Sequence, residues 1–301
     1  MKNNISFTIL AVIALSSTPL NAANTISEGS SEVVSALQAS QFPTMSVAVG
    51  SPIPDGWIIV ETLWGRHTIQ DVTAATYRTT TYFTATMASP IPDGFVVTQQ
   101  YTGSSGGSGG SRELTCVRGA KYGFNIYAKD TSPLPTGFVI LRKGGGQIYL
   151  AATDGARTHD TIRAITGTVP PKGWIVSWRG NEQEGVEIKN LIGARYRETV
   201  RAALGSPVPD GWVISGVLGS ANEVTNLNGA KYLDRITVYG GSAIPAGWVN
   251  IFNGNVGITE LVYLIGAKKG DEYSVKFGSP IPKGWVVITQ QGSEQRIRYL
   301  G

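Results

Sequence analysis

The chain has 301 residues, of which 38 are glycine, two are histidine and one is cysteine, and its formal net charge is +4 at pH 7. One cysteine excludes an intrachain disulfide framework and a cysteine-based zinc site, and two histidines argue against a histidine-rich metal centre. The basic residues are scattered rather than clustered, so nucleic acid is not an expected partner, and we expect no metal and no cofactor.

Residues 1–22 have the features of a secretion signal peptide. Lys2 supplies a positive charge, and residues 5–15 form an apolar stretch that is too short to span a bilayer, which takes about 20 apolar residues. We expect cleavage after Ala22 or Ala23, although a retained membrane anchor is an alternative. No later segment is apolar enough to span a membrane, so the sequence predicts a secreted or periplasmic protein of a bacterium.

Residues 23–43 precede the first repeat and form an N-terminal arm. Residues 31–38 favour a short helix capped by Ser30 or Ser31, which are suitable N-cap residues. We expect this arm to be mobile and able to pack on one face of the domain that follows.

Residues 44–301 contain one unit of about 37 residues repeated seven times. Its signature is Ser-Pro-Ile-Pro-Asp-Gly-Trp at residues 51–57, and the aromatic residue that ends it returns at intervals of 38, 43, 36, 38, 36 and 37 residues. The seven aromatic residues are Trp57, Phe95, Phe138, Trp174, Trp212, Trp248 and Trp285. The long interval contains a Gly/Ser tract at residues 103–111, which we interpret as a surface loop insertion.

Each unit predicts three strands. Before the signature lies an alternating segment with one buried face, such as Phe83 and Ala85 around Thr84. After it comes an uninterrupted apolar run, such as residues 57–60, which is typical of a strand covered on both faces. A weaker third strand follows and leads into a Gly-Ala-Lys/Arg-Tyr motif. Whether this motif holds a fourth short strand is left open.

The last repeat is as regular as the middle ones, and neither end resembles a capping unit. An uncapped stack exposes sheet edges, whereas closure into a ring protects them. We therefore expect an all-β domain, a closed seven-bladed β-propeller, with a curved β-solenoid as the alternative. The repeats lack the Trp-Asp and kelch signatures.

Two tryptophans lie outside the repeated aromatic position and are candidate ligand-binding residues: Trp64 and Trp178. At the place of Trp178 the other units carry residues as different as Glu61, Gln99 and Gly216, which indicates an exposed position. An exposed aromatic ring suits the apolar face of a sugar or a peptide, although single exposed tryptophans often have no such role. The repeated aromatic residues, by contrast, are expected to pack between units.

The Gly-Ala-Lys/Arg-Tyr motif supplies the other candidate ligand-binding residues. In a closed ring its cations would form a circle of positive charge that concentrates anionic ligands. The alternative is a structural turn in which the tyrosine hydroxyl caps a backbone group. The candidate residues are Lys121, Tyr122, Arg195, Tyr196, Lys231 and Tyr232.

No catalytic arrangement stands out in the sequence. His67 and His159 fall at different places in different units, and Asp55, Asp93 and Asp210 recur only as turn formers. We therefore favour an exported, non-enzymatic protein that binds glycans in the manner of a lectin, or binds an envelope or host protein, through one rim of the ring. The alternatives are a polysaccharide-acting hydrolase or lyase with one site at the central opening, and a structural protein of the cell envelope.

Overall fold

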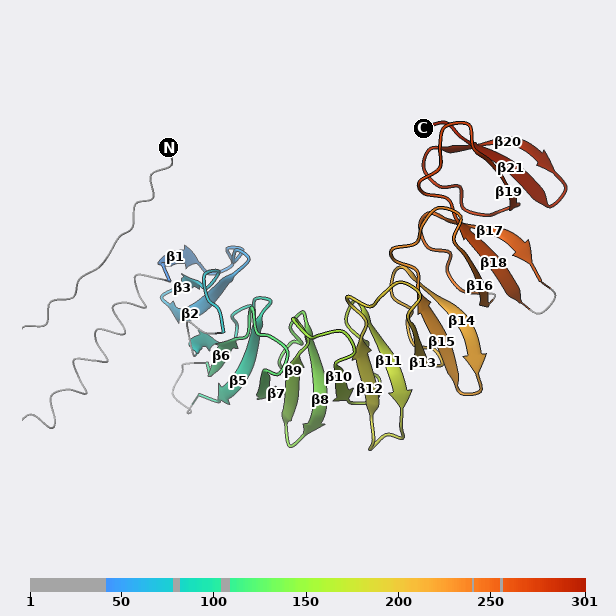
Figure 1. Ribbon diagram of the computed structural model, residues 1–301. Coiled ribbons are helices and arrows are strands. Elements are labelled where there is room, and N and C mark those ends of the chain that lie inside the picture. Colours follow the sequence, from blue (N-terminus) through green and yellow to red (C-terminus); the bar gives the residue numbers. More distant parts are fainter. Residues whose placement is uncertain (1–41, 78–81, 104–108, 240, 255–256) are drawn as a thin grey trace, which may run out of the picture.

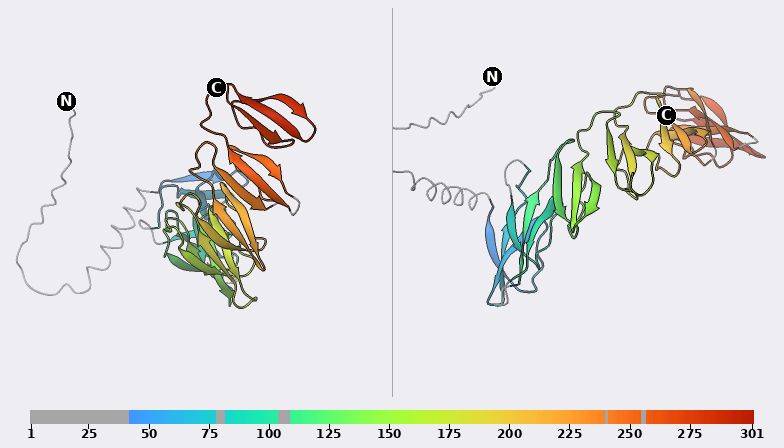
Figure 2. Two further views of the ribbon diagram at one scale, coloured as in Figure 1. Left: turned by 45° about the vertical axis from the view of Figure 1, so that its right-hand side comes forward. Right: turned by 90° about the horizontal axis from the view of Figure 1, so that it is seen from below.

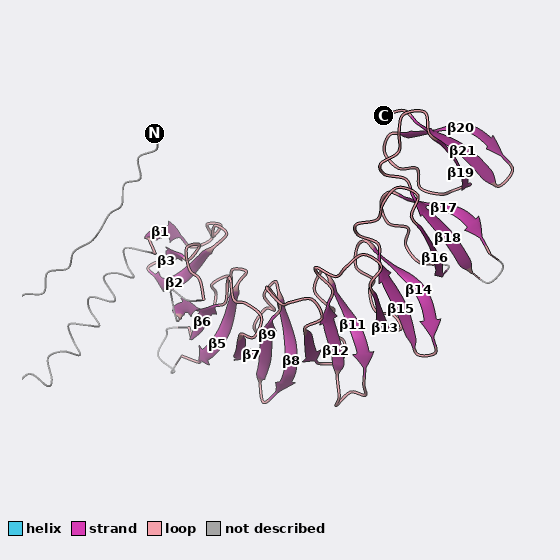
Figure 3. Cartoon of the chain, in the orientation of Figure 1, coloured by secondary structure: helices cyan, strands magenta, loops and turns pink. Residues whose placement is uncertain are grey.

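The computed structural model describes residues 42–301, apart from 78–81, 104–108, 240 and 255–256. The expected signal peptide (1–22), nearly all of the arm (23–43) and the centre of the Gly/Ser tract lie outside the described residues. Within the described part every regular element is a β-strand, as Figure 3 shows, which confirms the all-β class. The same residues include no helix with the length and apolarity that a bilayer crossing needs.

The strands form seven antiparallel sheets of three strands each, numbered here sheet 1 to sheet 7 in chain order. The first strands are β1 (Thr44–Ala48), β4 (Phe83–Thr86), β7 (Asn125–Lys129), β10 (Thr161–Ala164), β13 (Thr199–Ala203), β16 (Arg235–Tyr239) and β19 (Glu272–Lys276). The second strands are β2 (Trp57–Leu63), β5 (Phe95–Tyr101), β8 (Phe138–Gly144), β11 (Trp174–Arg179), β14 (Trp212–Leu218), β17 (Trp248–Asn253) and β20 (Trp285–Gln291). The third strands are β3 (Arg66–Asp71), β6 (Ser111–Cys116), β9 (Gln147–Ala152), β12 (Val186–Asn190), β15 (Ala221–Asn226), β18 (Ile258–Tyr263) and β21 (Glu294–Tyr299).

The third strand lies in the middle of every sheet, between the first and second strands. The first and second strands point the same way, because the proline-containing signature carries the chain from one end of the sheet back to the other, and each pairs antiparallel with the third strand. The signature ends in a type II turn: in sheet 1 the Trp57 N–H donates to the Pro54 carbonyl at 3.1 Å, and Gly56 between them has φ +80°. All seven signature glycines have φ between +79° and +86°, which explains their presence in every unit.

In each of the seven sheets the second strand contains a β-bulge three residues after its aromatic start. This feature was not predicted from the sequence. In sheet 1 the register shifts between Ile59 and Glu61, so Val60 is the extra residue. The bulge leaves the Ile59 N–H without a ladder partner, and the Ser89 hydroxyl of sheet 2 accepts it at 2.8 Å. Equivalent serine contacts of 2.8–3.0 Å join sheets 2 and 3, 4 and 5, 5 and 6, and 6 and 7.

The hydrophobic core is divided into six clusters, each lying chiefly between two consecutive sheets. Between sheets 6 and 7, for example, Val249 and Leu264 pack against Val275 and Trp285. Neighbouring residues of a second strand therefore serve different clusters: Trp248 is buried against sheet 5 and Val249 against sheet 7. Within sheets 2 to 6 this arrangement confirms that the apolar run is covered on both faces and that the repeated aromatic residue packs between units, whereas Trp57 of sheet 1 is only partly buried. In sheet 7, however, Val286 and Val287 are exposed.

The seven sheets form an open, curved stack, and the closed ring expected from the sequence is not observed. Sheet 1 and sheet 7 lie at opposite ends of the arc in Figure 1 and in the right-hand view of Figure 2. Contacts between sheets run from each second strand to the next first strand, as from β2 to β4 and from β17 to β19. The arc has the curvature of the solenoid alternative, but in the described residues strands pair only within a unit, so the array is an open stack of separate three-stranded sheets.

We expect Ser206→Ala to lower the free energy of unfolding by about 1–3 kcal/mol, because it leaves the buried Val176 N–H without an acceptor. Urea denaturation measures this loss. Ser51→Ala is the matched control, since Ser51 holds the same place in sheet 1 but faces no preceding sheet among the described residues; its effect should stay within about 0.5 kcal/mol. Equal effects of the two substitutions would show that the serine contact between sheets contributes nothing.

Candidate functional site

The two edges of the arc carry different parts of the repeat. The second strands run outward, so the hairpins that join them to the third strands lie on the convex edge (Figure 1). The signature turns and the Gly-Ala-Lys/Arg-Tyr motifs lie at the other end of each sheet, on the concave edge. Residues that recur every 37 positions are therefore lined up along one edge of the molecule.

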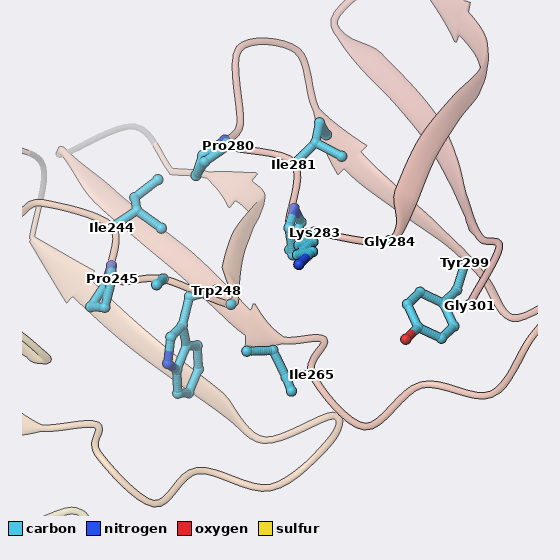
Figure 4. A pocket seen from close by; sticks show the side chains of 13 residues that line it. Ile244, Pro245, Trp248, Ile265, Pro280, Ile281, Lys283, Gly284, Tyr299 and Gly301 are labelled. Atoms are coloured by element: carbon cyan, nitrogen blue, oxygen red, sulfur yellow. The ribbon is translucent and has the colours of Figure 1, made fainter.

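A groove of about 660 Å³ opens between the signature turns of sheets 6 and 7. Ile244, Pro245 and Trp248 line its first wall and Ile281 and Tyr299 its second, as Figure 4 shows. Two further lining residues are accessible: Ile265, which is 54% exposed, and Lys283. The groove is thus a largely apolar cleft with a cation and a phenol at its second wall.

The same groove recurs at other places between sheets with a different chemistry. Between sheets 4 and 5 it measures about 550 Å³, and the Lys172 ammonium lies 3.7 Å from the Asp210 carboxylate across it. Between sheets 5 and 6 it measures about 510 Å³ and contains Asp210 and Asn228. Between sheets 2 and 3 it is smaller, about 300 Å³, and contains Arg118 and Asp154. The grooves share a place in the repeat but present different side chains.

The motif tyrosines, which were candidate ligand-binding residues, join successive sheets. The Tyr196 hydroxyl donates to Asp234 at 2.7 Å, and the Tyr232 hydroxyl donates to Asp271 at 2.8 Å. The Tyr122 hydroxyl donates to the Thr161 carbonyl at 3.1 Å. Each hydroxyl therefore has a partner within the protein; that of Tyr122 meets a backbone group, as the structural alternative expected, and the other two meet carboxylates.

The motif cations are exposed but stand beside carboxylates. Lys121 forms an ion pair with Asp154, and the backbone N–H groups of Arg195 and Lys231 donate to the carboxylates of Glu198 and Asp234 at 2.9 and 2.7 Å. The same contact is made by Asp160 and Asp271, so an acidic residue recurs three positions after the motif cation. This recurrence in the sequence could have indicated that the cations have carboxylates beside them. The motif cations and the carboxylates beside them therefore form a row of mixed charge along the concave edge. This row follows an arc instead of the expected circle.

These contacts shift the pKa values of both partners. Burial, together with the hydrogen bond to Asp271, raises the pKa of Tyr232 to about 12. The Lys268 N–H and the Tyr232 hydroxyl lower the pKa of Asp271 below its ordinary value. A lowered carboxyl pKa stabilises the folded state above the ordinary value of about 4, and this contribution is lost as the pH falls through the lowered pKa.

We expect Asp271→Ala to destabilise the protein at pH 7 and to have a smaller effect at pH 3. The carboxylate links Lys268 to Tyr232 across sheets 6 and 7, and protonation weakens both hydrogen bonds. Urea denaturation at the two pH values gives the difference between variant and wild type. Asp210→Ala is the control, since Asp210 is almost fully exposed and its ion pair with Lys172 is long, 3.7 Å, and open to solvent. A difference for Asp271→Ala that does not change with pH would contradict this role.

The structure does not bring Trp64 and Trp178 together. Trp64 is at the β2–β3 hairpin tip of sheet 1, 97% exposed and with φ +52°. Trp178 lies just after the bulge of β11 in sheet 4, is 41% exposed, and has the Arg163 guanidinium 5.7 Å from its ring centre. The prediction that the Trp178 position is exposed is confirmed. Both tryptophans are placed away from the grooves of the concave edge.

A fifth groove, of about 680 Å³, was not foreseen from the sequence. It is lined by His159 together with Arg195, Tyr196 and Glu198, and His159 Nε2 lies 2.5 Å from the Glu198 carboxylate. In the described part of the chain no three His, Cys, Asp or Glu side chains are grouped so that they could hold a metal ion. Cys116 is a buried free thiol, and burial raises its pKa.

Comparison of this chain with protein-family models, with curated proteins and with solved structures finds no match.

Proposed function

We propose that the protein is an exported, non-enzymatic binding protein that holds an extended polypeptide segment of an envelope or host protein along its concave edge. The observation that carries the proposal is the recurrence of one groove between successive signature turns. A chain-like ligand can occupy several such grooves at once, which raises its total affinity without any single strong site.

The chemistry of the grooves favours a polypeptide. The groove between sheets 6 and 7 offers isoleucine, proline, tryptophan and tyrosine surfaces with Lys283 beside them, which suits an apolar side chain near an acidic one. The groove between sheets 4 and 5 offers both Lys172 and Asp210. A sequence of unlike grooves suits a ligand whose units also differ from one position to the next.

The closed propeller expected from the sequence would bind through a rim and would offer a central opening. In an open arc the corresponding surface is the concave edge. The binding proposal holds for either shape because the grooves lie between neighbouring sheets.

A display library of random 12-residue peptides, selected on the full chain, tests the proposal. We expect selected peptides to bind saturably, and we expect Ile265→Glu to abolish this binding by placing a charge in the apolar groove between sheets 6 and 7. Leu63→Glu is the matched control: Leu63 is also an exposed aliphatic residue, 53% against 54%, but it lies at the hairpin end of β2. Failure to select any peptide, or equal binding by both variants, would contradict the proposal.

Glycan recognition is the second candidate, and Trp178 is the observation that favours it. Its exposed indole beside the Arg163 guanidinium offers a stacking face and hydrogen-bond donors to a sugar. A glycan array should then show saturable binding that weakens in Trp178→Ala, and weakening in Trp64→Ala would assign that residue as well. A blank array would remove this candidate.

A further inference from the structure

The outer face of sheet 1, called here the leading face, carries apolar residues that are more exposed than their counterparts in the later sheets. Val47 is half-buried, whereas the six residues at its place in sheets 2 to 7 are at most 2% exposed. Met45, two residues earlier on the same face of β1, is 47% exposed. In each later sheet this face is covered by the preceding sheet.

The outer face of sheet 7, called here the trailing face, also exposes apolar residues whose counterparts in other sheets are buried. Val286 is 38% exposed, whereas the residue at its place in the other six sheets is at most 2% exposed. Leu300 is 51% exposed, whereas Leu191, Leu227 and Leu264 at its place are at most 3% exposed. Within the chain the next sheet covers these positions.

The two faces also match in hydrogen bonding. At five of the six interfaces between sheets, the N–H at the bulge of one sheet donates to the signature serine of the next sheet. The trailing face has the bulge, with the Val287 N–H at the donor position. The leading face has the serine, Ser51, with no bulge N–H opposite it among the described residues. Donor and acceptor are therefore each present on one end.

The charges of the two ends follow the pattern of an internal pair. Lys172 and Asp210 precede the signature glycines of sheets 4 and 5, and their charged groups lie 3.7 Å apart. At the same places, sheet 7 has Lys283 and sheet 1 has Asp55. A sheet 1 placed after sheet 7 would repeat the order of lysine followed by aspartate.

We propose that the protein assembles head to tail, with the trailing face of one copy packed on the leading face of the next. The contact repeats the interface that joins consecutive sheets inside the chain. It is weaker than the internal interfaces because it lacks a hydrogen bond between a tyrosine hydroxyl and a carboxylate. Pro43 occupies the place at which Asp234 and Asp271 accept that hydrogen bond in later units. Such a heterologous contact produces rings of several copies or helical filaments, according to the rotation between copies.

Disulfide trapping between two variants that each carry one added cysteine tests the contact. Val47→Cys and Val286→Cys take the places of Val275 and Val249, which share one core cluster between sheets 6 and 7, and the native Cys116 is buried. We expect a cross-linked dimer only when the two variants are mixed and oxidised. Lys143→Cys, at the convex end of β8, mixed with either variant controls for random collision.

Three trapping results would overturn the proposal. Cross-linking of either variant with itself would indicate a symmetric contact. A disulfide within one chain carrying both substitutions would indicate closure of the single chain into a ring. Absence of any cross-link would indicate that the faces do not meet, as when part of residues 1–41 covers one of them.

Sedimentation velocity of the full chain over a range of concentrations gives an independent test. We expect concentration-dependent association, weakened about 5- to 100-fold by Ser51→Ala, which removes an acceptor from a buried N–H. Lys283→Asp and Asp55→Lys should each weaken association up to about five-fold, since the pair is exposed, and the double variant should restore it. A chain that stays monomeric at all concentrations, or variants that associate as wild type does, would contradict the proposal.

Discussion

Replacing Trp248 by alanine is expected to lower the free energy of unfolding by about 3–5 kcal/mol. Trp248 is 1% exposed and fills the cluster between sheets 5 and 6 together with Val213 and Leu261. In a stack where each sheet touches only its neighbours, the cavity weakens one interface, and we expect sheets 6 and 7 to unfold at a lower urea concentration than the rest. Urea denaturation followed by tryptophan fluorescence and circular dichroism measures both effects.

Trp64→Ala is the control for this substitution. It removes the same side chain from a position that is 97% exposed, so its effect should stay within about 0.5 kcal/mol. If the two substitutions cost the same, the repeated aromatic residue would not be what holds successive sheets together.

Gly247→Ala is expected to cost about 2–5 kcal/mol, because two penalties coincide. The backbone at Gly247 has φ +84°, where alanine is disfavoured by about 1–2 kcal/mol. An added methyl group would also lie 2.6 Å from Tyr263 Cε2 and 2.7 Å from Ile265 Cδ1. The Tyr263 ring packs on Trp248 with 5.3 Å between ring centres, so it cannot move aside freely, and overpacking costs a further 1–3 kcal/mol or so.

Gly137→Ala separates the two penalties. Gly137 holds the same place in sheet 3 with φ +80°, but an added methyl group would meet no atom within 4 Å. We therefore expect only the backbone cost at Gly137, and urea midpoints should rank wild type, Gly137→Ala and Gly247→Ala in falling order. The reverse order of the two variants would show that contacts of the added methyl group with Tyr263 and Ile265 do not destabilise Gly247→Ala.

The strands could be predicted from the sequence because each has a local signal. Alternation at Phe83 and Ala85 marks a strand with one buried face, and the uninterrupted run from Trp212 marks one that lies between two other sheets. The signature glycines follow from the positive φ that a type II turn requires. These features depend on neighbours in the chain, and the repeat presents each of them several times.

The shape of the whole array could not be predicted in this way. Whether seven sheets close depends on the small rotation between each pair, which is set by contacts such as that of Ser89 with the bulge at Ile59. The bulge itself has no signal in the apolar run that contains it. Regular end repeats favour closure when the sequence alone is considered, but the exposed Val286 and Leu300 show that a regular repeat can form an open end.

The candidate site was foreseen in part. The exposed position of Trp178 followed from its variability among units. The role of Tyr196 and Tyr232 depended on a partner in the next unit, Asp234 or Asp271, whose position close to the tyrosine appears only when sheets are stacked. The grooves also need two units to form, so no single repeat could indicate them.

The distance between the two end faces within one chain tests the central claim, an open array of seven sheets joined by one repeated interface. A chain carrying Val47→Cys and Val286→Cys, spin-labelled at both sites and diluted into an excess of unlabelled protein, reports this distance by pulsed electron resonance, while the buried Cys116 is inaccessible to the label. The account predicts a separation far greater than the roughly 10 Å between packed sheets. A distance comparable to that between neighbouring sheets would show a closed ring and contradict the open arc.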